Sequence, residues 1–172
     1  MILETSRLRL RELNLEDSEF IIELLNTPGW LQFIGDKNVR TKDQAINYLE
    51  KGPLKSYYEN GFGLSLVEKK ADGVSIGTCG ILKRDTLDKP DLGFAFLPEY
   101  TGMGYAYEVA KALLEYTYHE LKQPEIYAIT KTENHSSIKL LIKLNFEFEK
   151  MVNLNADAEE LKLFKINLES LL

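Results

Sequence analysis

The stretch LGFAFLPEYTGMGYAYEVAKALLEY, Leu92 to Tyr116, changes character in its middle. The residues before Pro98 are mostly apolar and aromatic, which is typical of a buried strand. After the second glycine, apolar residues recur at 3.6-residue spacing and predict an amphipathic helix over Tyr105–Leu121. Between the two lies a short turn, Thr-Gly-Met-Gly, at residues 101–104. The sequence therefore predicts a strand, a glycine turn and a helix at the centre of the fold.

A glycine turn at the start of a helix can bind an anion. The first helical turn leaves backbone N–H groups without intrahelical partners, and the aligned peptide dipoles make that end positive. Glycines let a ligand approach the backbone closely, and phosphate is the usual occupant. Gly102 and Gly104 therefore suit a phosphate site, although two glycines at such a junction more often mark an ordinary tight connection. The turn lacks the fingerprints of a dinucleotide-binding loop and of a P-loop, which argues against a nucleotide-dependent oxidoreductase.

Periodicity predicts the other strands and helices. Alternating residues, or short apolar runs bounded by turn residues, predict strands at 7–13, 62–70, 74–82, 125–130, 146–152 and 161–168. Apolar residues that share one helical face predict helices at 18–26, after Thr41, and at 137–144. Residues 71–73, Ala-Asp-Gly, suit a hairpin turn between two of these strands. The order β-α-α-β-β-β-α-β-α-β-β predicts a mixed α/β domain.

Turn and capping residues mark the ends of the first two helices. Residues 27–29, Thr-Pro-Gly, would end the first helix and lead into a loop that holds Trp30. Thr41 and Gln44 have the spacing of a capping box at the start of the second helix. Gly52-Pro53 would break the chain after it.

Composition bounds the class of protein. The chain has 172 residues, of which 44% are hydrophobic and 28% charged, as in an ordinary globular domain. No apolar run approaches the roughly 20 residues that span a bilayer, and the charged N-terminus does not resemble a signal peptide, so we expect a cytoplasmic protein without membrane contact. The net charge of -6 argues against nucleic-acid binding. One cysteine and two histidines suggest no metal site.

These residues resemble the GNAT superfamily of acetyl-CoA-dependent N-acetyltransferases, in the branch that contains the ribosomal-protein N-terminal acetyltransferases. The family signature is Gln/Arg-x-x-Gly-x-Gly/Ala, and Gly104 and Ala106 match it, whereas Thr101 stands where Gln or Arg is expected. The resemblance covers nearly the whole chain, through segments TSRLRLREL (5–13), SIGTCGI (75–81), PEYTGMGYAYEVAKALLEY (98–116) and NHSSIKLLIKLNFE (134–147). Asn145 occupies the place of a family glycine, and asparagine tolerates the left-handed angles that end a helix.

The resemblance implies a fold and a cofactor site. The implied fold is α/β (α+β): a single mixed, mostly antiparallel, splayed sheet of about seven strands, flanked by about four helices. We expect residues 1–172 to form one GNAT-like acetyltransferase domain. Acetyl-CoA would bind where two central strands splay apart, with its pantetheine arm along the main chain of Phe94, Ala95 and Phe96. Its pyrophosphate would lie over Thr101, Gly102, Met103, Gly104, Tyr105 and Ala106. The two phenylalanines can fill the core at the same time, because the backbone would do the binding.

The resemblance also implies catalytic residues. Asn134 would contact the cofactor, and Ser137 would lie near the sulfur and could protonate the departing thiolate. Asn134 is equally a good helix N-cap. Because an amine is protonated at neutral pH, a base must first deprotonate it, and Asp91 stands where family members often carry a base or relay residue. The alternative for Asp91 is a solvated surface carboxylate. Trp30, Phe33 and Tyr48 could line the acceptor pocket or pack in the core.

The predicted function is direct acetyl transfer from acetyl-CoA to a primary amine, either a protein N-terminus or a small molecule. The alternative is a non-catalytic module on the same fold that binds acyl-CoA or a partner protein. The acidic chain suits a cationic amine. The sequence is compatible with both a monomer and a homodimer.

Overall fold

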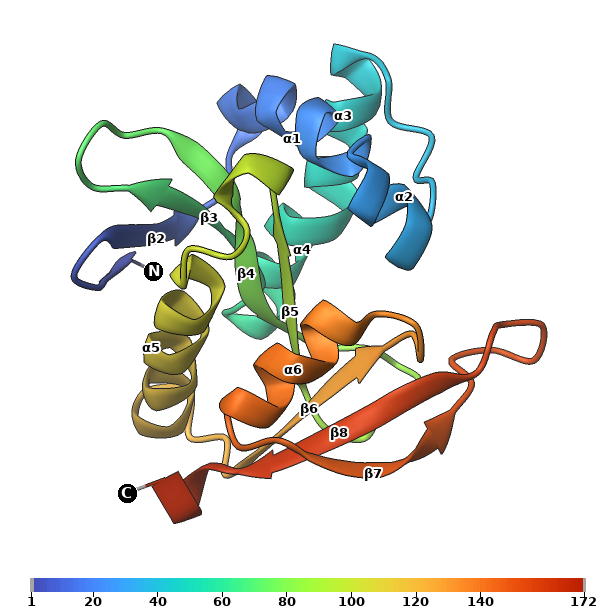
Figure 1. Cartoon of the computed structure of the whole chain (residues 1–172). Helices are drawn as coiled ribbons and strands as arrows, with labels where there is room; N and C mark the ends of the chain where they lie inside the picture. Colours follow the sequence, from blue (N-terminus) through green and yellow to red (C-terminus); the bar gives the residue numbers. More distant parts are fainter. Residues whose placement is uncertain (1, 172) are drawn as a thin grey trace.

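Residues 2–171 are described by a computed structural model (Figure 1). The strands are β1 (Ile2–Glu4), β2 (Leu8–Glu12), β3 (Leu64–Lys69), β4 (Ser75–Leu82), β5 (Asp91–Phe96), β6 (Glu125–Thr130), β7 (Glu147–Val152) and β8 (Leu161–Asn167). The α-helices are α1 (Ser18–Leu25), α2 (Pro28–Phe33), α3 (Lys42–Leu49), α4 (Lys55–Asn60), α5 (Tyr105–His119) and α6 (His135–Lys143). Short turns of other helix types are η1 (Leu15–Asp17), η2 (Glu50–Leu54), η3 (Pro98–Tyr100) and η4 (Leu168–Leu171).

The strands of residues 2–171 form one eight-stranded sheet in the order β1-β2-β3-β4-β5-β6-β8-β7. All neighbours are antiparallel except β5 and β6, which run parallel and share only the register pair Asp91–Tyr127. Beyond that pair the two strands diverge, as Figure 1 shows. The prediction of a mixed, mostly antiparallel, splayed sheet is confirmed.

Helices cover both faces of the sheet with two separate cores. One core joins α5 and α6 to the strands through buried helix residues such as Leu113 and Leu141. The other joins α1 and α3 to the opposite face through residues such as Leu24 and Leu49. Burial of each such leucine contributes about 1.5–3 kcal/mol, so both faces are held by apolar packing.

The residues of β5 alternate between these two faces. Leu92, Phe94 and Phe96 pack with the α5/α6 core, whereas Ala95 packs with the α1/α3 core. Because successive strand residues point to opposite faces, Asp91 shares the face of Ala95. The strand therefore presents one set of side chains to each helical layer.

Three local predictions differ from the structure. The predicted loop around Trp30 is helix α2, because Thr27 caps it and Pro28 occupies the first helical position, where its fixed φ fits. Gly52-Pro53 does not break the chain: the π-helical turn η2 carries α3 directly into α4, and its wider ring accommodates a buried proline that lacks an N–H. An eighth strand, β1, was missed because three residues are too few to show alternation.

Other local predictions are confirmed. The capping box of α3 is formed by Gln44 N–H donating to Thr41 Oγ1 at 3.3 Å and Thr41 N–H donating to Gln44 Oε1 at 3.0 Å. The hairpin turn after β3 closes at Gly73, with φ +71°. Asn145 ends α6 in the left-handed region with φ +68°. Each of these depends on contacts within a few residues, which is why the sequence alone predicts them.

Gly80 gives a test of how closely β3 and β4 pack. A Cβ at this position would lie 2.5 Å from Cα of Leu64 and closer still to the Gly63 carbonyl oxygen, both backbone atoms. We expect Gly80→Ala to lower the free energy of unfolding by about 3 kcal/mol, measured by chemical denaturation, because the strands must move apart.

The control for this measurement is Gly29→Ala, whose added Cβ has no neighbour within 4 Å. Gly93→Ala should fall between the two, because the one atom that its Cβ would crowd, at 2.8 Å, is Cδ1 at the far end of the Leu82 side chain. Equal costs at Gly80 and Gly29 would show that β3 and β4 are not in tight backbone contact.

Candidate active site

The gap between β5 and β6 is the central feature of the candidate site. Beyond the Asp91–Tyr127 pair, the described residues of the two strands share no register pair. The main-chain groups of β5 that face β6 are therefore left for another partner. Phe94, Ala95 and Phe96, the residues expected to contact pantetheine, lie in this diverging part of β5.

The glycine turn at residues 101–104 follows β5 and begins α5. Gly102 and Gly104 have φ of +75° and +81°, and Gly104 is the N-cap of α5. Within residues 2–171 no side chain caps this helix, so its first N–H groups remain available to a ligand. The Thr101 hydroxyl donates to the Pro98 carbonyl oxygen at 2.7 Å, so this side chain closes the turn. The turn can bind an anion with main-chain groups alone.

A polar cluster fixes the start of α5 to the turn between β1 and β2. Glu108 Oε1 accepts from the Thr5 hydroxyl at 2.6 Å and from Arg7 N–H at 2.8 Å, and Oε2 accepts from Arg7 Nε at 2.7 Å. Arg7 also donates to the Met103 carbonyl oxygen at 3.1 Å, and its guanidinium carbon lies 4.4 Å from the centre of the Tyr105 ring. These contacts hold the glycine turn in place.

The start of α6 lies at the same end of the sheet as the glycine turn, because each helix follows the carboxyl end of one of the two parallel strands. Asn134 Oδ1 accepts from Ser137 N–H at 3.2 Å, which confirms the N-cap role of Asn134. The Ser137 side chain is half-buried, and its hydroxyl makes no hydrogen bond among the described residues. The hydroxyl therefore keeps its donor and its acceptor capacity for another partner.

Asp91 lies at the closed end of the gap, on the sheet face opposite Ser137. It is only 1% exposed, and Arg84 Nε donates to both of its carboxylate oxygens, at 2.9 and 3.1 Å. The alternative of a solvated surface carboxylate is therefore wrong. Burial raises the pKa of Asp91, and the Arg84 charge opposes this shift without cancelling it. Of the residues expected to contact the cofactor, Phe94 and Phe96 pack on the α5/α6 face, whereas Ala95 lies on the same face as Asp91.

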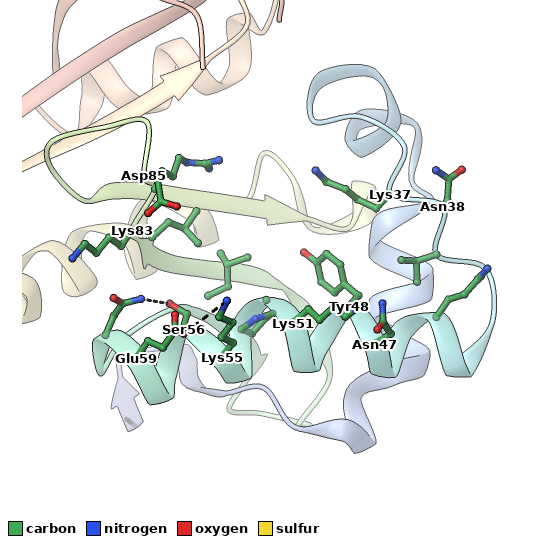
Figure 2. A pocket seen from close by; sticks show the side chains of 18 residues that line it. Lys37, Asn38, Asn47, Tyr48, Lys51, Lys55, Ser56, Glu59, Lys83 and Asp85 are labelled. Carbon is green, nitrogen blue, oxygen red and sulfur yellow. Dashed lines mark hydrogen bonds and ion pairs between the residues drawn. The ribbon is translucent and has the colours of Figure 1, made fainter. Parts of the chain in front are cut away.

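A pocket of about 840 Å³ lies on the same face as Asp91, between the α3–α4 helices and the strands (Figure 2). Leu64 and Leu82 form part of its lining from the sheet, and Arg84 also lines it. We call it the α3–α4 pocket. Figure 2 shows Tyr48 directed from α3 into this space, and burial raises the pKa of its phenol to about 12.

The sequence predicted only part of this pocket. Of the three aromatic residues expected at an acceptor pocket, Tyr48 lines the α3–α4 pocket, Trp30 packs in the α1/α3 core and Phe33 is not among the lining residues. Sequence analysis missed the pocket lysines, which come from three segments: Lys37, Lys51 and Lys55, and Lys83. No local pattern connects these segments, because only the fold brings them together.

Comparisons with known proteins agree with this geometry. A domain model described as "Acetyltransferase (GNAT) domain" matches residues 7–147. The protein described as uncharacterized N-acetyltransferase YoaA of Bacillus subtilis is 28% identical over 150 residues, covering 86% of this chain and 84% of that protein. No helix among the described residues is long and apolar enough to cross a membrane.

Two solved structures show the same fold. An acetyltransferase (GNAT family) from Bacillus anthracis has a TM-score of 0.80 at 22% identity, covering 98% of this chain and 99% of that one. The ribosomal L7/L12 alpha-N-protein acetyltransferase RimL, solved in complex with coenzyme A, has a TM-score of 0.81 at 15% identity, covering 97% and 98%.

The Glu108 cluster predicts a pH dependence of stability. Partial burial raises the pKa of Glu108, but hydrogen bonds from Thr5 and Arg7 outweigh it and leave the pKa below the ordinary 4.5. A carboxylate with a lowered pKa stabilises the fold above its unfolded pKa, and this contribution is lost as pH falls through the folded value. We expect Glu108→Gln to cost about 1–3 kcal/mol at pH 7 and progressively less below pH 4.5.

Denaturant unfolding of both proteins from pH 7 to pH 3 measures this difference. The matched control is Glu115→Gln, an exposed residue of the same helix, which should change stability little at any pH. A Glu108→Gln cost that stays constant over the whole range would contradict the assignment.

Proposed function

The chain belongs to the acetyltransferase (GNAT) family, and on this premise we propose that it transfers an acetyl group directly from acetyl-CoA to a primary amine. The observation that carries the proposal is the diverging β5–β6 pair that leads into an uncapped helix with two left-handed glycines. This arrangement offers a chain of unpaired main-chain groups that ends in an anion site.

The proposed cofactor position follows from these groups. The pyrophosphate lies over the N–H groups of the glycine turn and the first residues of α5. The pantetheine arm then runs back along β5, bonding the main chain of Phe94, Ala95 and Phe96. At about 3.3 Å per residue, the six residues of β5 give it roughly 20 Å of strand. The thioester therefore lies near the closed end of the gap, with Asn134 and Ser137 above the arm on the α5/α6 face.

The acceptor approaches from the other face. The α3–α4 pocket opens over β3 and β4, and Leu82, one of its lining residues, is the register partner of Asp91. The two substrates would then meet across the sheet at the closed end of the gap. Positioning of two reactants is the main contribution that such a direct transfer requires.

The chemistry needs two proton transfers. The amine nitrogen bonds to the thioester carbon, the C–S bond breaks, and the amine loses a proton while the thiolate gains one. We assign the first transfer to Asp91, directly or through a water molecule, because each oxygen bonded to Arg84 keeps a further lone pair. We assign the second to the unpaired hydroxyl of Ser137.

A non-catalytic acyl-CoA-binding module is the second candidate. It is favoured by Leu141, which is only 1% exposed in the α5/α6 core and stands near the place where some family members carry a catalytic tyrosine. In this case the cofactor would bind without turnover.

Calorimetric titration with CoA, followed by an assay of free CoA release from acetyl-CoA across a panel of amines, tests the proposal. We expect binding of CoA, and release of CoA that depends on the amine.

Gly104→Ala should weaken CoA binding about tenfold, because a side chain at φ +81° costs about 1–2 kcal/mol and shifts the turn. Gly29→Ala is the control and should bind as the wild type does. Binding without release on any amine would favour the module, and absence of CoA binding would exclude both.

The pH–rate profile of Asp91→Asn tests the base. In the wild type, kcat/KM should fall as pH drops through the raised pKa of Asp91, because the protonated carboxyl cannot accept a proton. Asp91→Asn should lower kcat about a hundredfold and remove this acid limb, with CoA affinity unchanged. Ser137→Ala should lower kcat but keep the fall of kcat/KM at low pH. An unchanged profile in Asp91→Asn would rule out Asp91.

A further inference from the structure

The α3–α4 pocket carries the opposite charge to the chain as a whole. The chain has a net charge of -6, yet the pocket is lined by five cationic and two acidic side chains. The cationic ones are Lys37, Lys51, Lys55, Lys83 and Arg84, and the acidic ones are Glu59 and Asp85. Such local excess of one sign in a concave site attracts ligands of the other sign.

Internal ion pairs neutralise only part of this charge. Lys55 lies 3.8 Å from Glu59, and Arg84 pairs with Asp91 beside the pocket. Lys37, Lys51 and Lys83 form no ion pair with any of residues 2–171. Figure 2 shows Lys37 at one end of the space and Lys83, with Asp85, at the other. Uncompensated positive charge is therefore spread along the length of the pocket.

The pocket also lies close to Asp91, where the proposed reaction needs the acceptor amine. Leu64 pairs with Gly80, and Gly80 pairs with Gly93, so the part of the pocket lined by Leu64 is two strands from β5. Arg84 reaches from the pocket lining to Asp91, at the closed end of the gap. An acceptor with its amine at Asp91 would extend between the lysines.

From these observations we infer that the acceptor amine carries a carboxylate close to its amino group, and that Lys37, Lys51 and Lys83 recognise this anion. The inference rests on the proposed function. The volume of about 840 Å³ suits a small acidic molecule or the first residues of an acidic peptide. Tyr48, Asn38, Asn47 and Ser56 supply uncharged hydrogen-bonding groups around it. The pocket cations would repel a polyamine. The negative charge of the whole chain therefore favours a cationic acceptor, whereas the charge of the pocket favours an acceptor with an anionic group.

The same charges help the reaction. Nearby cations disfavour the protonated form of an amine and lower its pKa. An acceptor held among lysines by its carboxylate would therefore present more of its neutral, nucleophilic amine. Recognition of the anion and activation of the amine follow from one arrangement of charge.

Three dipeptide amides that differ only in the first side chain provide the test: Asp-Ala-amide, Asn-Ala-amide and Lys-Ala-amide. Each has a free α-amine and similar size. From free CoA release, we expect kcat/KM to be at least tenfold higher for the Asp probe than for the Lys probe, with the Asn probe between them. Raising the salt concentration should shrink this preference, because exposed charges are screened.

Variants locate the effect in the pocket. Lys51→Gln/Lys83→Gln should lower kcat/KM for the Asp probe about tenfold, mostly through KM, and leave the Asn probe nearly unchanged, since each partly exposed pair contributes a few-fold in affinity. Lys111→Gln is the matched control, an exposed lysine of α5 on the opposite face of the sheet, and should leave the preference intact.

The outcomes separate this inference from the proposed function. Turnover that is equal for the three probes, or highest for the Lys probe, overturns the inference and leaves the acetyltransferase standing. If no amine is acetylated, the inference is tested by calorimetric binding of the Asp probe to the CoA-loaded protein. Binding that is lost in Lys51→Gln/Lys83→Gln supports the anion site and refutes only the enzyme, whereas absence of binding to the wild type overturns the inference.

Discussion

The site depends on two parallel strands that stay together for a single residue pair. Strand pairing normally satisfies backbone N–H and C=O groups, and each such group buried without a partner costs about 1–3 kcal/mol. Because β5 and β6 separate after Asp91 and Tyr127, the groups of β5 on that side need water or a ligand. A long, flexible cofactor with amide groups of its own can replace the missing strand. Under the proposed function, the gap would bind the cofactor because the sheet is incomplete there.

The rest of the fold keeps this incomplete sheet stable. Packing on both faces holds β5 from above and below, through Phe94 on one side and Ala95 on the other. The Thr5–Arg7–Glu108 cluster fixes the start of α5 to residues that are about a hundred positions away in sequence. Rigid surroundings matter because a loosely held main chain would lose the binding geometry that a direct transfer requires.

The sequence predicted the features that are decided locally. The strand, the glycine turn and helix α5 were predictable because periodicity and two glycines act within a few residues, as do the Thr41 cap and the left-handed Asn145. Pro53 was misread because a proline usually ends a helix, whereas here it is buried inside a π-helical turn that continues from α3 into α4. The burial of Asp91 could not be predicted from the sequence either, because the exposure of a side chain depends on the tertiary fold around it.

Charge shows the same division between local and tertiary information. Net charge is a sum over the chain, and it says nothing about where each sign gathers. Here the segment before α3, η2, α4 and the segment after β4 bring cations to one concavity, although the chain as a whole is acidic. Arg84 lines that concavity and pairs with the buried carboxylate of Asp91, so the pocket and this carboxylate are electrostatically coupled. A change in the charge of the pocket therefore acts on the proton affinity of Asp91 as well as on the ligand, because the two lie within one Coulombic field.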